Sequence, residues 1–168
     1  MKRNFVMAGV AALVFALSLI GASAKADFSG TWTLDKSKSE GLPAALKDQV
    51  LVVKQEGDKL TIDNQLTTEA GDQHSTDIYS LDGKPADFTQ KGPGGAEGKG
   101  KRTAKWTADG NGADIKEEVT YETPQGAIAV DIERKWMLSA DGKTLTIDMS
   151  ISSAMGSQQM KRVFVKKT

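Results

Sequence analysis

An abrupt change in composition close to the N-terminus constrains this chain more than any other feature of its sequence. Before the change, Lys2 and Arg3 lead into an apolar run from Phe5 to Ile20, which ends in a cluster of small residues. After the change, the sequence alternates between apolar and polar residues and contains many short turn signals. A basic start, a short apolar stretch and small residues are typical of a secretory signal peptide. The sequence therefore predicts an export signal over 1–26, with an N-terminal helix, and one folded domain over 27–168.

Two overlapping Ala-x-Ala cleavage sites follow the apolar run, Ala22-Ser23-Ala24 and Ala24-Lys25-Ala26. We favour cleavage after Ala26, because Asp27 then starts the alternating pattern. The alternative is an uncleaved membrane anchor, but a helix over the apolar run would be about 24 Å long, which is short of the ~30 Å hydrocarbon core. We therefore expect a periplasmic or secreted bacterial protein without a stable membrane span after cleavage.

Charge and cysteine content exclude several classes of protein. The chain has 22 basic and 22 acidic residues, and removing Lys2, Arg3 and Lys25 with the signal leaves 19 basic against 22 acidic residues. Nucleic-acid binding depends on an excess of basic residues, so we expect no nucleic-acid partner. Because the chain has no cysteine, neither disulfides nor a cysteine lipid anchor is available to it.

The mature sequence reads as a series of hairpins, in which short alternating segments are separated by turns such as Asp82-Gly83 and Asp141-Gly142. We predict a single antiparallel up-and-down β-barrel of about 8–9 strands, since closure would remove the sheet edges. A two-sheet sandwich or an open sheet is the alternative. Pro43 to Asp48 is expected to form one or two helical turns, and Lys91 to Gly100 a flexible loop. The strands are expected near 28–34, 49–56, 59–66, 73–81, 99–108, 113–122, 127–139, 143–152 and 158–166.

Hairpin arithmetic assigns one face of four consecutive strands to the interior. A two-residue turn at Asp141-Gly142 places Trp136 opposite Ile147. A turn near Gln125 places Glu117 opposite Ile132, and a turn at Gly110-Asn111 places Arg102 opposite Val119. The face defined by these pairs is mainly apolar. Its polar exceptions are therefore the residues to consider for binding.

The mature start resembles the first strand of lipocalin-like (calycin) barrels, whose Gly-x-Trp motif falls here on Gly30 and Trp32. The resemblance implies that Trp32 closes the floor of the barrel and that a basic residue of the last strand stacks on it. Arg162 is suitably placed for that role, which would add a cation–π contact.

Nearly the whole mature chain also resembles a group of small secreted bacterial proteins of unknown function. These proteins begin with Phe-x-Gly-x-Trp-x-Leu, here Phe28 to Leu34, and carry a late Trp-x-Leu-Ser-x-Asp-Gly-Lys-Thr-Leu-Thr, here Trp136 to Thr146. The resemblance implies export and a β-barrel, and it implies no activity.

The residue types needed for common catalytic and metal sites are missing or isolated. His74 is the only histidine and there is no cysteine, so a histidine-cluster metal site and a cysteine nucleophile are impossible. His74 lies in a polar stretch typical of an exposed loop or edge strand. We therefore predict no catalytic residues, no metal, no cofactor and no enzymatic activity.

Four charged residues interrupt the predicted interior face: Arg102, Glu117 and Arg134, with Arg162 a possible fourth. A charge that points into a barrel must be paired or hydrated. One interpretation is a buried Arg–Glu–Arg network that fixes the strand register. The other is an anion site, because two guanidiniums against one carboxylate leave positive charge for a ligand.

These patterns favour an exported, non-enzymatic protein that binds a small, partly apolar ligand, neutral or anionic, with Arg102, Glu117 and Arg134 as candidate ligand-binding residues. The alternative is an envelope interaction or stress-related protein whose barrel is filled by its own side chains. An eight-stranded barrel permits either outcome, so the two hypotheses differ in whether the interior has room for a ligand.

Overall fold

The structure is a computed structural model that describes residues 25–92, 95–124 and 126–167, so all but the last two residues of the predicted signal segment lie outside it. No helix in these ranges is long and apolar enough to cross a membrane. The described chain forms β1 (Gly30–Leu34), β2 (Leu46–Glu56), β3 (Lys59–Thr68), β4 (Gly71–Ser80), β5 (Ala86–Lys91), β6 (Glu97–Trp106), β7 (Gly112–Thr123), β8 (Gly126–Leu138), β9 (Thr144–Ser153) and β10 (Gly156–Lys166).

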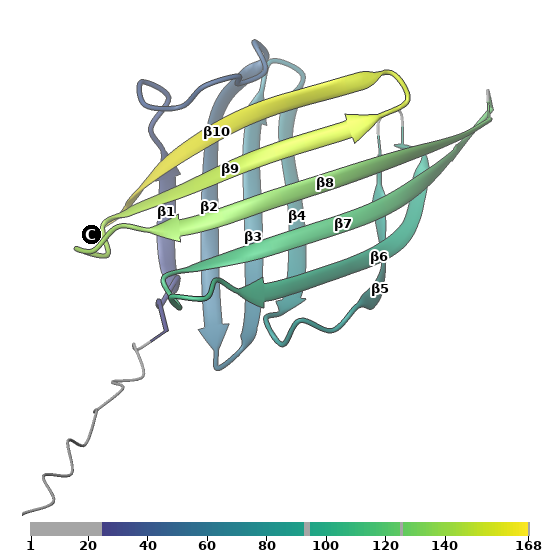
Figure 1. Cartoon of the computed structure of the whole chain (residues 1–168). Helices are drawn as coiled ribbons and strands as arrows, with labels where there is room; N and C mark the ends of the chain where they lie inside the picture. Colours follow the sequence, from purple (N-terminus) through teal and green to yellow (C-terminus); the bar gives the residue numbers. More distant parts are fainter. Residues whose placement is uncertain (1–24, 93–94, 125, 168) are drawn as a thin grey trace, which may run out of the picture.

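All ten strands belong to one antiparallel sheet in the order β4-β3-β2-β1-β10-β9-β8-β7-β6-β5. The sheet curls so that β1–β4 lie behind β7–β10, and the side chains between these two parts form the interior (Figure 1). No strand pairing joins the edge strands β4 and β5 within the described ranges, and β4 instead contacts β6. The predicted 8–9-stranded barrel is therefore a ten-stranded up-and-down half-barrel, in which these two edges remain.

The sequence-based prediction omitted β5 and placed β6 too late. In β5 only Phe88 is a buried apolar residue, so this short edge strand has no alternating pattern. The segment from Lys91 to Gly100 was expected to be a loop, but β6 already begins at Glu97. Gly98 and Gly100 lie in β6 at positions where a side chain would not fit. A Cβ at Gly100 would lie 1.9 Å from the carbonyl oxygen of Glu118 in β7. These glycines thus allow close strand packing.

The segment from Pro43 to Asp48 forms no helix. β2 already begins at Leu46, after a turn in which the amide of Leu46 donates to the carbonyl of Pro43 at 3.0 Å. The expected helical turns are therefore wrong, and the chain enters the sheet directly from a turn.

The predicted register is confirmed for β7–β8 and β8–β9, where Glu117 pairs with Ile132 and Trp136 pairs with Ile147. The prediction for β6–β7 is wrong by two residues, since Arg102 lies opposite Glu117. The cause is a four-residue loop, closed by a hydrogen bond from Thr107 N to Gly112 O at 2.9 Å. A shift by two residues keeps each side chain on its face of the sheet, so the predicted interior face is retained.

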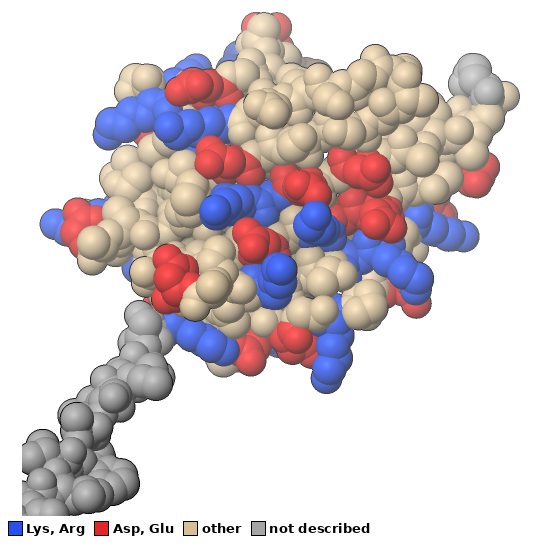
Figure 2. Space-filling view, viewed as in Figure 1, with Lys and Arg blue, Asp and Glu red and all other residues tan. Residues whose placement is uncertain are grey.

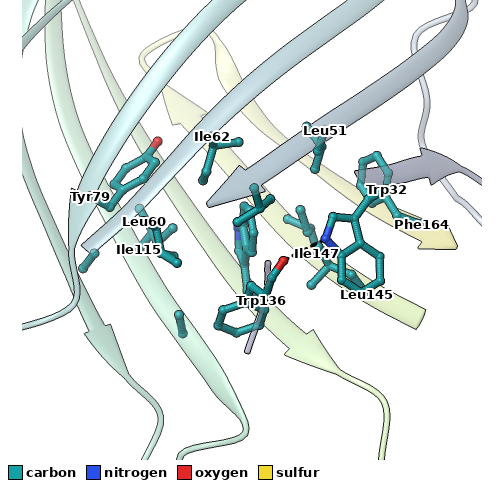
Figure 3. Close-up of a cluster of buried hydrophobic side chains, with 14 of the residues drawn as sticks. Trp32, Leu51, Leu60, Ile62, Tyr79, Ile115, Trp136, Leu145, Ile147 and Phe164 are labelled. Carbon is teal, nitrogen blue, oxygen red and sulfur yellow. Dashed lines mark hydrogen bonds between the residues drawn. The ribbon is translucent and has the colours of Figure 1, made fainter. Parts of the chain in front are cut away.

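One half of the interior is filled by large apolar side chains, and we call it the packed half. Phe28 and Trp32 are fully buried there, and Phe28 packs edge-on against Trp136 with ring centroids 5.7 Å apart. Figure 3 shows side chains from both parts of the curled sheet meeting in this cluster. Its other buried members are Leu34, Leu46, Leu51, Val53, Leu60, Ile62, Tyr79, Leu81, Ala104, Ala113, Ile115, Leu145, Ile147 and Phe164.

The other half of the interior is less filled, and we call it the open half. Its core is a small cluster of Phe88, Val119, Tyr121 and Ile132, against which Val130, Met149 and Ile151 are only partly buried. On β4, Gln73 and Ser75 follow the same alternation as buried Tyr79, yet both are exposed. The open half thus has inward positions that solvent reaches.

The outer face carries a row of seven alternating charges, which we call the charge ladder. Each member pairs with the next across neighbouring strands, in the order Asp82, Lys105, Asp114, Lys135, Asp148, Lys161 and Glu40. Figure 2 shows acidic and basic side chains interspersed over this face, in front of β6–β10. Opposite charges across antiparallel strands favour the observed pairing, so the ladder supports the register of the sheet.

Candidate functional site

A band of polar side chains separates the packed half from the open half, and we call it the polar belt. Along β7, Glu117 lies between Ile115 of the packed half and Val119 of the open half, and along β8 Arg134 occupies the equivalent position. The belt brings together residues of seven strands. Its members are Gln49, Asn64, Asp77, Arg102, Glu117, Arg134 and Arg162.

Glu117 is the centre of the belt and its side chain is only 1% exposed. Arg134 Nη1 donates to Glu117 Oε2 at 2.5 Å, and the Tyr79 hydroxyl donates to Glu117 Oε1 at 3.0 Å. Burial raises the pKa of the Tyr79 hydroxyl, so it stays a donor. Burial alone would lower the pKa of Arg134, but Tyr79 and Glu117 outweigh burial and raise it. Arg134 therefore keeps its positive charge beside Glu117.

Arg102 of β6 contacts β4, whose outer edge has no strand partner in the described sheet. Its Nη1 lies 3.3 Å from Asp77 Oδ1 and 3.9 Å from Glu117 Oε1. Its guanidinium also lies 4.9 Å from the ring centroid of Tyr79 and 4.3 Å from that of Phe88, which are cation–π distances. With two carboxylates and two rings as partners, Arg102 is engaged by the protein itself.

Arg162 differs from the other two arginines because its observed partner is uncharged. Its Nη1 donates to Gln49 Oε1 at 2.9 Å, and Gln49 in turn donates to Asn64 Oδ1 at 2.7 Å. The Arg162 Nε atom is buried without a hydrogen-bond partner among the described residues. Burial and the positive charge of Arg134 lower the pKa of Arg162. An arginine nevertheless stays protonated, so Arg162 carries the charge that the belt leaves uncompensated.

A cavity of about 100 Å³ lies beside this uncompensated charge. Arg134, Arg162 and Trp136 line it together with Gln49 and Asn64. Trp136 is 3% exposed, and its indole Nε1 has no hydrogen-bond partner within the described part of the chain. A buried N–H without a partner costs free energy. Asp77 also lines the cavity, so its wall combines two arginines and a tryptophan with one carboxylate.

The belt as a whole has an excess of positive charge. It contains three guanidiniums, those of Arg102, Arg134 and Arg162, and the carboxylates of Asp77 and Glu117. Since Asp77 and Glu117 contact only the first two arginines in the described structure, the excess lies at Arg162. The predicted trio of Arg102, Glu117 and Arg134 is indeed brought together, but its charges are largely satisfied.

The expected stacking of Arg162 on Trp32 is wrong. Trp32 is fully buried, but Lys166 is its cross-strand neighbour and places Nζ 5.2 Å from the indole centroid. Arg162 lies four residues earlier along β10, too far to reach the ring. Gly30 makes room for this arrangement: its φ is +137°, and a Cβ there would lie 2.6 Å from Lys166 Cε. The floor of the packed half is therefore formed by Gly30, Trp32 and Lys166.

Sequence reasoning missed Gln49, Asn64, Asp77, Tyr79 and Trp136 as polar members of the site. The strands β2, β3 and β4 were not placed in register with the rest, so their inward polar residues could not be aligned with the arginines. A signal was nevertheless present: Asp77 precedes the aromatic Tyr79 by two residues, as Arg134 precedes Trp136. Inward residues of one strand recur at that spacing.

The residue types that bind metals lie apart from one another in the part of the chain that the structure describes. The described ranges contain no group of three or more Asp, Glu, His or Cys side chains placed to hold a metal ion. His74 is exposed on the edge strand β4, as its polar surroundings predicted.

No protein-family model and no curated protein matches this sequence. Among solved structures, zebrafish ileal bile acid-binding protein complexed with cholic acid superposes with a TM-score of 0.51 at 19% identity, over 83% of this chain and 98% of that one. Secretory abundant heat soluble protein 4 of Ramazzottius varieornatus gives a TM-score of 0.49 at 11% identity, over 84% of this chain and 95% of that one. The first likeness shows a shared fold: this chain is a curled antiparallel sheet of calycin-like type.

Proposed function

We propose that this protein is a non-enzymatic binding protein for a small amphipathic ligand with an acidic group. The observation that carries the proposal is the cavity beside Arg162, where a buried guanidinium and the Trp136 indole N–H have unused donors. A carboxylate or similar anion would accept from both, and hydrogen bonds to charged groups are roughly twice as strong as neutral ones. Arg134 would contribute further positive charge from the same cavity wall.

The size of the cavity limits what it can hold. At about 100 Å³ it is well below the 300–1,000 Å³ of pockets for drug-sized molecules, so only the acidic group would enter it. The apolar part would then lie in the open half, against the partly buried side chains of Val130, Met149 and Ile151. The packed half blocks deeper entry because Phe28, Trp32 and Trp136 fill it.

The fold supports this proposal without identifying the ligand. The zebrafish structure was solved with cholic acid, an amphipathic carboxylic acid, bound to the same type of curled sheet. The uncompensated charge at Arg162 is the feature that favours an acidic group. We further propose that the protein acts after export, as its N-terminal sequence predicts.

Calorimetric titration with oleate, and with oleyl alcohol as its uncharged counterpart, tests the proposal. We expect oleate to bind the wild-type protein at least tenfold more tightly than the alcohol. Arg162→Met should remove this preference, because it keeps an unbranched apolar stem but removes the charged guanidinium. Lys161→Met is the matched control, since this neighbouring residue lies on the outer charge ladder, and it should leave both affinities unchanged.

Equal affinities of the wild-type protein for the acid and the alcohol would contradict an anion site. Native mass spectrometry of protein purified from its own host supplies a second test, with a co-purified acidic ligand expected. Absence of both oleate binding and a co-purified ligand would favour the alternative, an interaction protein whose interior is closed by its own side chains.

A further inference from the structure

Lys25 and Ala26, which precede the first strand, are integrated into the folded domain. Lys25 Nζ forms an ion pair with Asp58 Oδ1 at 2.6 Å and lies 5.1 Å from the ring centroid of Trp106. The amide of Ala26 donates to the carbonyl of Gly110 at 2.8 Å, and its carbonyl accepts from Gln55 Nε2 at 3.0 Å. The two residues thus contact the hairpins β2–β3 and β6–β7 at once.

These contacts continue without interruption into the packed half. Gln55 also accepts from the amide of Phe28 at 3.0 Å, so one side chain holds both ends of the segment 26–28. Phe28 stacks on Trp106 with centroids 5.9 Å apart, and Trp106 donates to Asp58 at 2.8 Å. Lys25, Trp106 and Asp58 therefore form one cluster with the residues that anchor Phe28.

The two candidate processing sites differ in whether they preserve this cluster. Cleavage after Ala26 would remove Lys25 and both backbone hydrogen bonds of Ala26, and it would place a charged α-amino group on Asp27. Cleavage after Ala24 would leave every one of the contacts described above intact. Both sites have the small residues that signal peptidase requires, so the fold is what distinguishes them.

We propose that signal peptidase cleaves this chain between Ala24 and Lys25, so that Lys25 is the first residue of the mature protein and part of its fold. This replaces the sequence-based preference for cleavage after Ala26. The proposal rests on export, and it does not depend on any ligand.

The test is expression of the full-length chain in a bacterium, followed by N-terminal sequencing and intact-mass measurement of the exported product. We expect the sequence to begin Lys-Ala-Asp-Phe. In a Lys25→Arg variant, the mass of the exported product should change, because the substituted residue is retained. A product that begins at Asp27, whose mass is the same in the variant and the wild type, would overturn the proposal, as would a product that retains Met1.

A pair of variants separates the two sites, because Ala22 belongs only to the first and Ala26 only to the second. Ala22→Phe should abolish or slow formation of the product that begins at Lys25. Ala26→Phe should leave the cleavage position unchanged, whatever its effect on stability. The reverse pattern would show that the second site is used.

Discussion

The packed and open halves of the interior share the strands β7, β8 and β9, yet they differ in what fills them. In β9, Ile147 is 4% exposed beneath Trp136 and Phe164 of the packed half. Four residues along the same strand, Ile151 of the open half is only partly buried. The difference indicates that hydrophobic stabilisation is concentrated on one side of the polar belt, while the other side is less filled. The following predictions test this division.

The largest effect is expected at the polar belt itself. Glu117→Gln should lower the free energy of unfolding by about 3–5 kcal/mol, because it leaves the buried Arg134 without its carboxylate. Urea denaturation measures the change. Glu118→Gln is the matched control on the exposed face of the same strand, and it should change stability by less than about 0.5 kcal/mol. Equal effects of the two substitutions would show that the belt contributes nothing to stability.

The second prediction compares the halves directly through Ile147→Ala and Ile151→Ala. Ile147→Ala should cost about 2–5 kcal/mol, the usual cost of such a change in a packed core. Ile151→Ala should cost less than about 1 kcal/mol, since its side chain is only partly buried and packs against a smaller cluster. Titration with oleate should show the opposite ranking, with binding weakened by Ile151→Ala. A larger stability loss at Ile151 would refute the division into two halves.

The third prediction concerns the floor of the packed half. Gly30→Ala should cost roughly 1–3 kcal/mol, because a residue with a side chain is strained at φ +137° and its Cβ would displace Lys166 from Trp32. Gly57→Ala is the control: its φ is +62°, but an added Cβ would meet no atom within 4 Å. Thermal unfolding should therefore show a smaller loss for Gly57→Ala, and the Trp32 indole NMR signal should shift only in Gly30→Ala.

The smallest expected effect is a pH dependence of stability that arises from Asp58, at the end of the packed half. Hydrogen bonds from Lys25 and then Trp106 hold the pKa of the Asp58 carboxyl below its usual value. A lowered folded-state pKa contributes stability above the unfolded value of about 3.9, and that contribution is lost as the pH falls through the folded-state pKa. Carboxyl NMR titration should find a low midpoint for Asp58. In Asp58→Asn the fall in thermal stability from pH 6 to pH 3 should be smaller than in the wild type.

Local alternation in the sequence was sufficient to predict the antiparallel meander and the inward face of β7, β8 and β9. It also placed Glu117 and Arg134 inside, because a hairpin turn fixes the partner of each residue. The unjoined edges at β4 and β5 were not predictable from alternation, since β5 has one buried apolar residue and β4 contacts β6 instead, through Asp77 and Arg102.

The sequence also could not predict that the uncompensated positive charge lies at Arg162. Arg162 and Gln49 are 113 residues apart, and only the pairing of β1 with both β2 and β10 brings them together. The prediction that Arg162 stacks on Trp32 failed for a similar reason. Which basic residue lies over Trp32 depends on the register of β1 with β10, and that register places Lys166 there. Such long-range pairings carry no local signal in one sequence.

The charge ladder has a consequence for how molecules approach this protein in solution. Its seven members alternate in sign at the strand spacing of about 5 Å, which is shorter than the Debye length of about 8 Å at physiological ionic strength. The electric fields of these charges therefore largely cancel within a short distance. The charge ladder neither attracts nor repels a charged molecule at long range. An anionic ligand would be guided only at close range, so its association rate should depend little on salt.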